Sequence, residues 1–360
     1  MKHIAIVGIQ GIPANYGGFE SLVENIIGDN CSDGVHYTVY CSGKDCKSRM
    51  RKYKGAALRY IPCHANGAVS TLYDIVGLLR SLRGFDAVVV LGVSGGVFLP
   101  VFSRLCRSRL IVNIDGLEHR RDKWGRFAKW FLRTSEALAV RSADVVIADN
   151  KGIQDYVRET YGVESVLIAY GGDHVLRTVP ENRAAEILRQ YGVVRDGYAM
   201  TVCRIEPENN TQMVLEAFAQ TGDRLLYIGN WERSEYGRTL REKYRGCPNI
   251  VMADAVYDLD VLYVLRSMCR CYIHGHSAGG TNPSLVEAMF FAKPILAYDV
   301  VYNRETTEGK AQYFKTSEEL AGLLRSPLAY TATDMAGIAG RRYTWAHIAR
   351  QYEELYKNNF

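Results

Sequence analysis

Short, uninterrupted apolar runs alternate along the first half of the chain with longer stretches whose apolar residues recur every three or four positions. The runs are typical of strands buried on both faces of a sheet, and the longer stretches are typical of helices that cover such a sheet. This alternation predicts a parallel, doubly wound α/β sheet. The expected strands are 4–7, 37–40, 57–61, 87–91, 110–114 and 145–148, and the expected helices are 19–27, 72–82 and 123–141.

The same pattern restarts near residue 199, after a polar stretch at 177–197 that we interpret as the junction between two domains. Two Rossmann-like domains are therefore expected, with a cleft between them and ligands at the carboxyl ends of the strands. The expected divisions are 1–176, 177–340 and a C-terminal segment at 341–360. In the second domain the expected strands are 199–203, 224–228, 250–252, 271–273 and 294–297, and the expected helices are 210–220, 234–245, 258–267 and 283–292.

The C-terminal segment predicts an amphipathic helix over 341–356, with Thr344 as a natural N-cap. Its apolar residues recur at helical spacing, which indicates packing against a core rather than a cofactor site. These residues are Trp345, Ile348, Tyr352 and Leu355.

Length and composition favour a two-domain protein of the cytoplasm. At 360 residues the chain exceeds the usual size of a single core, and its hydrophobic fraction of 48% is enough for two. No run of about 18 uncharged apolar residues occurs and the N-terminus leads straight into a strand, so neither a membrane span nor a signal peptide is expected. Nine scattered cysteines without a CxxC pair indicate reduced thiols rather than disulfides or a zinc site.

A glycine-rich loop at 274–282 lies between a predicted buried strand and a predicted helix that begins at Pro283. Thr281 or Asn282 can cap this helix, and proline suits its first position. Loop amides and the positive end of the helix together predict a site for a phosphate-like anion, with Glu287 one turn further on. The alternative is a tight turn from strand to helix with a surface glutamate.

The first loop, at 8–18, also contains glycines, but its spacing is not GxGxxG and it is longer than that motif allows. The second predicted strand, 37–40, and the residues after it lack the acidic side chain that would hold a ribose. Both features argue against a dinucleotide site. Gly17 and Gly18 still open a helix and are expected to offer amides to a phosphate.

Four segments and the C-terminal helix together form a specific pattern. The segments are 8–20, 113–118, 203–210 and 274–289, and the helix contributes 343–345. On this pattern the whole chain resembles the GT-B-fold glycosyltransferases of the large retaining family of type 4, which use nucleotide-diphosphate sugars. Its N-terminal half is similar to a bacterial group that includes rhamnosyltransferases of surface-polysaccharide assembly. The resemblance implies a GT-B architecture: two Rossmann-like domains facing a cleft, and a C-terminal helix that crosses back onto the first domain.

The resemblance also implies a donor site. Arg204 matches the arginine that holds the donor diphosphate, and Glu287 matches the second glutamate of a paired motif, which holds the nucleotide ribose. Asn209 stands where the family commonly has a lysine and Gly279 where it has the first glutamate, so amides from Gly279 to Ser284 are expected to hold the donor instead. The alternative for Arg204 and Glu287 is a structural or solvated surface position. The expected donor-binding residues are Gly17, Gly18, Arg204, Asn209, His276, Gly279, Gly280, Thr281, Asn282, Ser284 and Glu287.

The expected chemistry is transfer with retention, without a metal or any cofactor besides the donor. Arg204 is expected to stabilise the leaving diphosphate, and Asp115 to orient the acceptor hydroxyl or take its proton. The alternative for Asp115 is a cap on the following turn. Tyr16, Glu118 and His119 are the candidate acceptor-binding residues.

A basic and aromatic stretch at 123–133 predicts a helix with lysines and arginines along one side. Such a helix suits an anionic membrane surface, where lipid-linked acceptors are found. The alternative is an ordinary helix packed on the sheet by its aromatic side. Nucleic acid is not an expected partner, because no recognised binding motif accompanies the net charge of +5.

The function expected from the resemblance is a glycosyltransferase of the cytoplasm or the inner face of the membrane. It would transfer a sugar, foremost L-rhamnose from dTDP-rhamnose, to a saccharide or lipid-linked saccharide in surface-polysaccharide biosynthesis. Alternatives are another nucleotide-sugar transferase, a GT-B-fold sugar epimerase, or a non-catalytic sugar-nucleotide-binding subunit of an assembly. Asn209 and Gly279 favour the non-catalytic subunit, whereas Arg204, Glu287 and the complete loops favour the enzyme.

Overall fold

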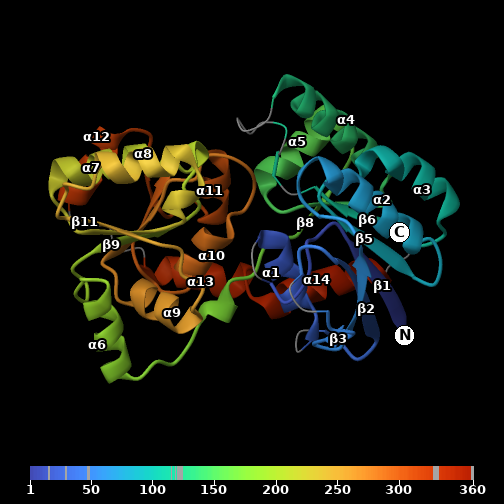
Figure 1. Cartoon of the computed structure of the whole chain (residues 1–360), viewed down its shortest axis with the longest axis horizontal. Helices are drawn as coiled ribbons and strands as arrows, with labels where there is room; N and C mark the ends of the chain where they lie inside the picture. Colours follow the sequence, from blue (N-terminus) through green and yellow to red (C-terminus); the bar gives the residue numbers. More distant parts are fainter. Residues whose placement is uncertain are drawn as a thin grey trace. The chain divides into compact units, whose positions relative to one another are not determined.

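The chain forms two compact units in a computed structural model that describes residues 1–14, 17–28, 31–46, 49–114, 116–117, 119, 125–326 and 332–357 (Figure 1). Unit 1 comprises Met1–Tyr170 with Trp345–Phe360, and unit 2 comprises Gly171–Thr344. The chain divides after Tyr170 and after Thr344, a few residues from the divisions expected after residues 176 and 340.

Unit 1 is built on an eight-stranded sheet in the order β3-β4-β2-β1-β5-β6-β7-β8. Only the pair β3 and β4 is antiparallel among the strand pairs of the described residues. The central strand, β1, pairs Ile4 with Tyr37 of β2 on one side and with Ala87 of β5 on the other. The strands are β1 Lys2–Val7, β2 Val35–Ser42, β3 Lys52–Tyr53, β4 Ala56–Ile61, β5 Ala87–Leu91, β6 Arg109–Asn113, β7 Val145–Ala148 and β8 Val166–Leu167.

Helices cover both faces of this sheet. Buried side chains of α1 and α14 share one hydrophobic core with strand residues such as Ile4, Ile6 and Val39. The helix after unit 2 thus returns to unit 1, as expected, and Asn113 of β6 donates a 2.9 Å hydrogen bond to the Tyr352 hydroxyl of α14. The helices are α1 Gly18–Ile26, α2 Ser70–Arg80, α3 Leu99–Leu105, α4 Arg126–Ser142, α5 Lys151–Tyr161 and α14 Trp345–Lys357, with short 3-10 turns at Gly67–Val69 and Gly96–Phe98.

Unit 2 contains a six-stranded sheet in the order β11-β10-β9-β12-β13-β14, with every pair parallel. This is the doubly wound order of the Rossmann fold, in which the strand sequence reverses between β9 and β12. The strands are β9 Ala199–Val202, β10 Leu225–Ile228, β11 Ile250–Ala253, β12 Cys271–His274, β13 Ile295–Tyr298 and β14 Gln312–Phe314. The helices are α6 Glu181–Gln190, α7 Thr211–Thr221, α8 Glu235–Lys243, α9 Leu259–Ser267, α10 Pro283–Met289, α11 Val301–Thr306, α12 Ser317–Arg325 and α13 Ala332–Arg342, with 3-10 turns η5 Asp173–Val175, η6 Pro207–Asn209 and η7 Trp231–Arg233.

The polar stretch 177–197, which we interpreted as the junction between the domains, lies within unit 2 and contains α6. Ala184 and Ile187 of this helix are buried in a core shared with α9. The single helix expected over 341–356 is instead the end of α13 and all of α14, separated at 343–344. Tyr343 is buried in this break and its hydroxyl donates to the Thr306 carbonyl, which holds the chain out of a continuous helix.

Candidate functional site

Two loops of unit 2 come together at the carboxyl ends of neighbouring parallel strands, β9 and β12. The Asn210 side-chain amide donates to the Gly275 carbonyl at 2.8 Å, and the Ser277 amide donates to the Glu208 carbonyl at 2.8 Å. Gly275 leaves no room for a side chain, because a Cβ there would collide with the Asn209 carbonyl. The structure therefore joins the sequence segments 203–210 and 274–289 into one site.

Asn209 is the buried centre of this junction. Its Nδ2 donates to the Arg204 carbonyl at 2.8 Å, and its Oδ1 lies 2.7 Å from Nδ1 of His276. Because Oδ1 can only accept, His276 carries its proton on Nδ1. Where the resemblance expects a lysine, this chain thus has an amide that fixes Arg204 and His276.

Arg204 itself extends to the surface, with 38% of its side chain exposed. Its guanidinium lies 3.7 Å from a Glu206 carboxylate oxygen, which is too long for a strong hydrogen bond. The residue is anchored through its carbonyl, and its side chain is partly exposed. This arrangement suits the recognition of a soluble anion.

The second loop leads into α10, which ends at Met289 rather than at the expected residue 292. Asn282, not Thr281, is the N-cap: its Oδ1 accepts from the Ser284 amide at 3.0 Å and from the Ser284 hydroxyl at 2.8 Å. Gly279 has a positive φ of 86°, a conformation that favours glycine. Thr281 is buried, and Gly280 is partly exposed beside it. Among the amides expected to hold a donor, that of Ser284 is therefore already used by the cap.

Glu287 is not a solvated surface residue. Its Oε2 accepts from Nη2 of Arg266 on α9, its Oε1 lies 3.6 Å from Nε2 of His174, and 17% of its side chain is exposed. Arg266 and His174 were not expected from the sequence, because neither belongs to a motif. The one available signal was an arginine inside the apolar periodicity of the helix predicted at 258–267.

His274 is buried at the end of β12, where the second loop begins. Burial lowers the pKa of His274 well below its usual value, with the neighbouring His276 as a smaller cause, so the ring is neutral near pH 7. Its Nε2 has no hydrogen-bond partner among the described residues. This atom is sealed from solvent, so the neutral ring belongs to the interior behind the loop and adds no charge there.

In unit 1, α1 begins at Gly18, with Gly17 as its N-cap at a φ of 108°. The Glu20 side chain folds back beside Gly17, and its Oε1 accepts from the Gln10 amide at 2.8 Å. A carboxylate therefore lies near the helix start that Gly17 and Gly18 were expected to offer to a phosphate. Its negative charge competes with an anion at that position.

His119 is the one acceptor candidate that the structure describes, and it lies beside the buried carboxylate of Glu136. His119 Nδ1 lies 3.2 Å from Oε2 of Glu136 on α4, and the hydroxyls of Tyr156 and Tyr161 on α5 donate to Oε1 at 2.8 and 2.7 Å. Burial favours the protonated form of Glu136, but these hydrogen bonds outweigh it and hold the pKa of this carboxyl below its usual value. The other candidates in unit 1, Tyr16, Asp115 and Glu118, lie outside the described residues.

The start of α4 exposes its aromatic side chains. Phe127 is 77% exposed and Trp130 62%, and their ring centroids lie 5.8 Å apart. Arg126 and Arg133 are exposed on the same two turns, with Lys129 partly exposed between them. Phe127 therefore faces solvent, contrary to the alternative in which the aromatic side of this helix packs on the sheet.

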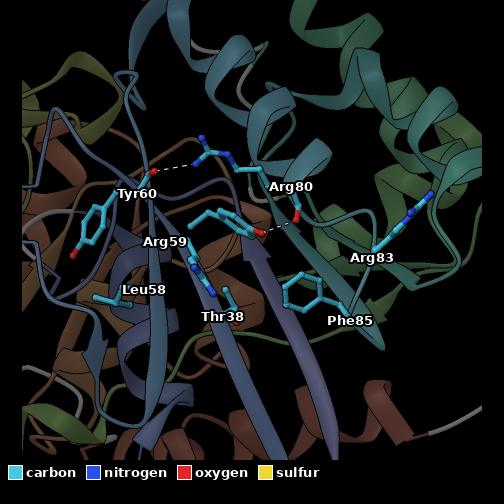
Figure 2. Close-up of a pocket in the computed structure, with 8 residues that line it drawn as sticks. Thr38, Leu58, Arg59, Tyr60, Arg80, Arg83 and Phe85 are labelled. Carbon is cyan, nitrogen blue, oxygen red and sulfur yellow. Dashed lines mark hydrogen bonds between the residues drawn. The ribbon is translucent and has the colours of Figure 1, made fainter.

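Unit 1 also contains a hollow of about 630 Å³ over strands β2 and β4, beside the end of α2 (Figure 2). The Tyr40 hydroxyl donates to the Arg80 carbonyl at 2.9 Å, and the Arg80 guanidinium donates to the Tyr60 carbonyl at 3.0 Å. None of the expected site residues lines this hollow. Its lining is Thr38, Tyr40, Leu58, Arg59, Tyr60, Arg80, Arg83 and Phe85.

No group of three or more His, Cys, Asp or Glu side chains among the described residues is arranged to hold a metal ion. Within the same residues, every helix is too short or too polar to cross a bilayer. A reaction without metal or cofactor stays a prediction.

Comparisons with known proteins establish the fold. Residues 1–173 match the family described as a domain of unknown function, DUF1972. No curated protein matches the sequence at a significant level. The structure is similar to sucrose-phosphate synthase from Thermosynechococcus elongatus (TM-score 0.83, 15% identity, 99% of this chain and 98% of that one) and to Anabaena HepE in complex with UDP-glucose (TM-score 0.77, 16% identity, 99% of each). It is also similar to a glycosyltransferase from Rickettsia africae (TM-score 0.72, 12% identity, 99% and 98%). The chain has the GT-B fold, and this prediction is confirmed.

Proposed function

We propose that this chain is a glycosyltransferase that moves a sugar from a nucleoside diphosphate donor to a saccharide or lipid-linked saccharide. One observation carries the proposal: the loop of Arg204 and the loop that leads to Glu287 are joined at the carboxyl edge of the unit 2 sheet. That edge is where doubly wound sheets bind ligands. HepE, which has the same fold, holds UDP-glucose in its solved structure.

The proposed reaction proceeds with retention. The bond between the anomeric carbon and the diphosphate oxygen breaks, a bond to the acceptor oxygen forms on the same face, and the acceptor proton moves to the diphosphate. Arg204 stabilises the negative charge that develops on the leaving group, and Glu287 accepts hydrogen bonds from the nucleotide hydroxyls. Asp115 is proposed to orient the acceptor hydroxyl or, as the alternative to the diphosphate, to take its proton; it lies outside the described residues.

For the donor we propose dTDP-rhamnose and for the acceptor a lipid-linked saccharide of surface-polysaccharide assembly, on the resemblance of segments 8–20 and 113–118. A thermal-shift panel of nucleoside diphosphates and their sugars, with and without Mg²⁺, tests the donor site. We expect metal-independent stabilisation by one base family, because a ligand that binds only the folded chain raises its melting temperature. The absence of a shift with every nucleotide would contradict the proposal.

The competing proposal is a non-catalytic sugar-nucleotide-binding subunit. The uncharged Asn209 and Gly279 favour it, because each replaces a charge that the resembled family carries. A single-turnover assay with radiolabelled donor and extracted lipid acceptors separates the two. Transfer of the label supports the enzyme, whereas tight donor binding without transfer supports the subunit.

We also propose that the first turns of α4 bring the protein to the inner face of an anionic membrane. Phe127 and Trp130 supply exposed apolar surface, and neighbouring cations attract acidic lipids. The double variant Phe127→Ser/Trp130→Ser is expected to lose at least about tenfold in binding to phosphatidylglycerol vesicles, measured by flotation at constant salt. The matched control is Tyr257→Ser, which removes an aromatic ring of similar exposure from unit 2. Equal flotation of both variants would contradict the proposal.

A further inference from the structure

Arg266 is a buried cation in the last turn of α9. The residue is 2% exposed, its Nη2 donates to Oε2 of Glu287, and its Nε and Nη1 have no hydrogen-bond partner among the described residues. Moving a guanidinium out of water is unfavourable unless an opposite charge accompanies it. The Glu287 carboxylate supplies that charge across two different helices.

The other oxygen of Glu287 faces different surroundings. Oε1 lies 3.6 Å from Nε2 of His174, a distance beyond direct hydrogen bonding. Burial lowers the pKa of His174, and this outweighs the opposing attraction of Glu287, so the ring is uncharged near pH 7. Glu287 thus has one oxygen fixed by a cation and one oxygen on its partly exposed side.

The loop and helix segment 274–289 contains no other acidic side chain. Where the resembled family has a first glutamate, this chain has Gly279. Any charged hydrogen bond from this segment to a hydroxyl of the ligand must therefore come from Glu287. Its orientation decides whether that bond forms.

We propose that Arg266 is a positioning residue of the donor site: it fixes Oε2 of Glu287, so that Oε1 accepts a hydroxyl of the nucleotide. The inference rests on the proposed function, because it assigns Arg266 through a ligand of Glu287. Arg266 does not touch the donor, since the atoms left unpaired on its guanidinium are sealed from solvent.

The proposal predicts that Arg266 affects only ligands that carry a hydroxyl for Glu287. Arg266 donates the hydrogen bond that fixes Oε2, so its removal releases the carboxylate from the orientation in which Oε1 accepts the hydroxyl. A nucleotide analogue without ribose hydroxyls makes no such hydrogen bond, so its affinity should not depend on Arg266.

The test is isothermal titration calorimetry with the nucleoside diphosphate that stabilises the chain most and with its analogue that lacks the ribose hydroxyls. Arg266→Met is expected to bind the nucleoside diphosphate about tenfold more weakly than the wild type and the analogue equally well, because one charge-assisted hydrogen bond is lost. Arg266→Lys keeps the charge and should restore most of the affinity. Glu287→Gln and the double variant Arg266→Met/Glu287→Gln should bind equally weakly, because both changes act on the same hydrogen bond.

The outcomes distinguish the proposed function from the role of Arg266. A wild type that binds no nucleotide overturns the proposed function and this inference together. Nucleotide binding by the wild type, with an Arg266→Met variant that binds equally tightly or loses the same affinity for both ligands, overturns the inference alone. If Arg266→Met does not fold, Arg266→Gln replaces it with the same expected result, and an affinity there that is unchanged or falls equally for both ligands also overturns the inference.

Discussion

The Arg204→Ala variant is expected to bind nucleoside diphosphates between about 10-fold and 100-fold more weakly than the wild type, because it loses a charge-assisted hydrogen bond to the diphosphate. The loss should be confined to ligands that carry phosphate and absent for the free nucleoside. The fold is expected to persist, since the residue contributes an accessible side chain while its backbone carbonyl, which anchors Asn209, remains. Calorimetric titration of the diphosphate and the nucleoside measures both effects.

The matched control is Arg270→Ala. Arg270 is exposed to a similar degree, 34%, but it precedes β12 at the amino edge of the same sheet and pairs with Asp223. Its replacement should leave nucleotide affinity unchanged. An Arg204→Ala variant that folds and binds diphosphate as tightly as this control would refute the assignment of Arg204 to the donor diphosphate.

The Asp74→Asn variant is expected to gain stability relative to the wild type as the pH rises from 4 to 8. Asp74 is buried on α2, and burial raises its pKa to about 7, although Ser94 and the Gly95 amide donate hydrogen bonds that favour the ionised form. In the unfolded chain an aspartate titrates near its model value of 3.8. The folded state therefore binds the proton more tightly than the unfolded state does.

The sign of the effect follows from linkage. The stability associated with a raised pKa is fully present below the unfolded value, and it is lost as the pH rises through the folded value of about 7. A shift of this size corresponds to about 4 kcal/mol by pH 8. Asparagine does not titrate and can still accept both hydrogen bonds, so the variant avoids this loss.

Urea unfolding at pH 4.5, 6 and 8 measures the difference in the free energy of unfolding between variant and wild type. The exposed Asp33→Asn change is the control, and its difference should stay constant with pH. A constant difference for Asp74→Asn as well would show that this carboxyl group does not retain its proton in the folded chain.

The sequence predicted best those elements whose pattern is set by local burial. Strands β5 and β7 were expected with the bounds that the structure shows, because strands covered on both faces are uninterrupted apolar runs. Helix α6 was missed, since it buries only Ala184 and Ile187 fully and the rest of its surface is polar. Such a helix differs little in composition from a linker.

In the candidate site, too, features set by neighbouring residues were expected and features set by distant residues were not. The glycine-rich loop after β12 and the helix at Pro283 were expected from turn and cap residues, which act within a few positions of one another. The use of Asn209 to join two loops was not expected, because its partner His276 lies 67 positions away. Glu20, which folds back beside Gly17, was also not expected, although a glutamate three residues after the N-cap of a helix commonly turns back in this way.

By itself, the sequence determined two parallel α/β sheets, most of their strands along the chain, and the loops at which ligands are expected. These features follow from the periodic burial of residues that are consecutive in the sequence. Only the tertiary structure decided which polar side chains meet: Arg266 with Glu287, His119 and two tyrosines with Glu136, and Asp74 with Ser94. Each of these contacts joins separate elements, and helical periodicity fixes which face of a helix is buried but not which residue of a neighbouring element that face will meet.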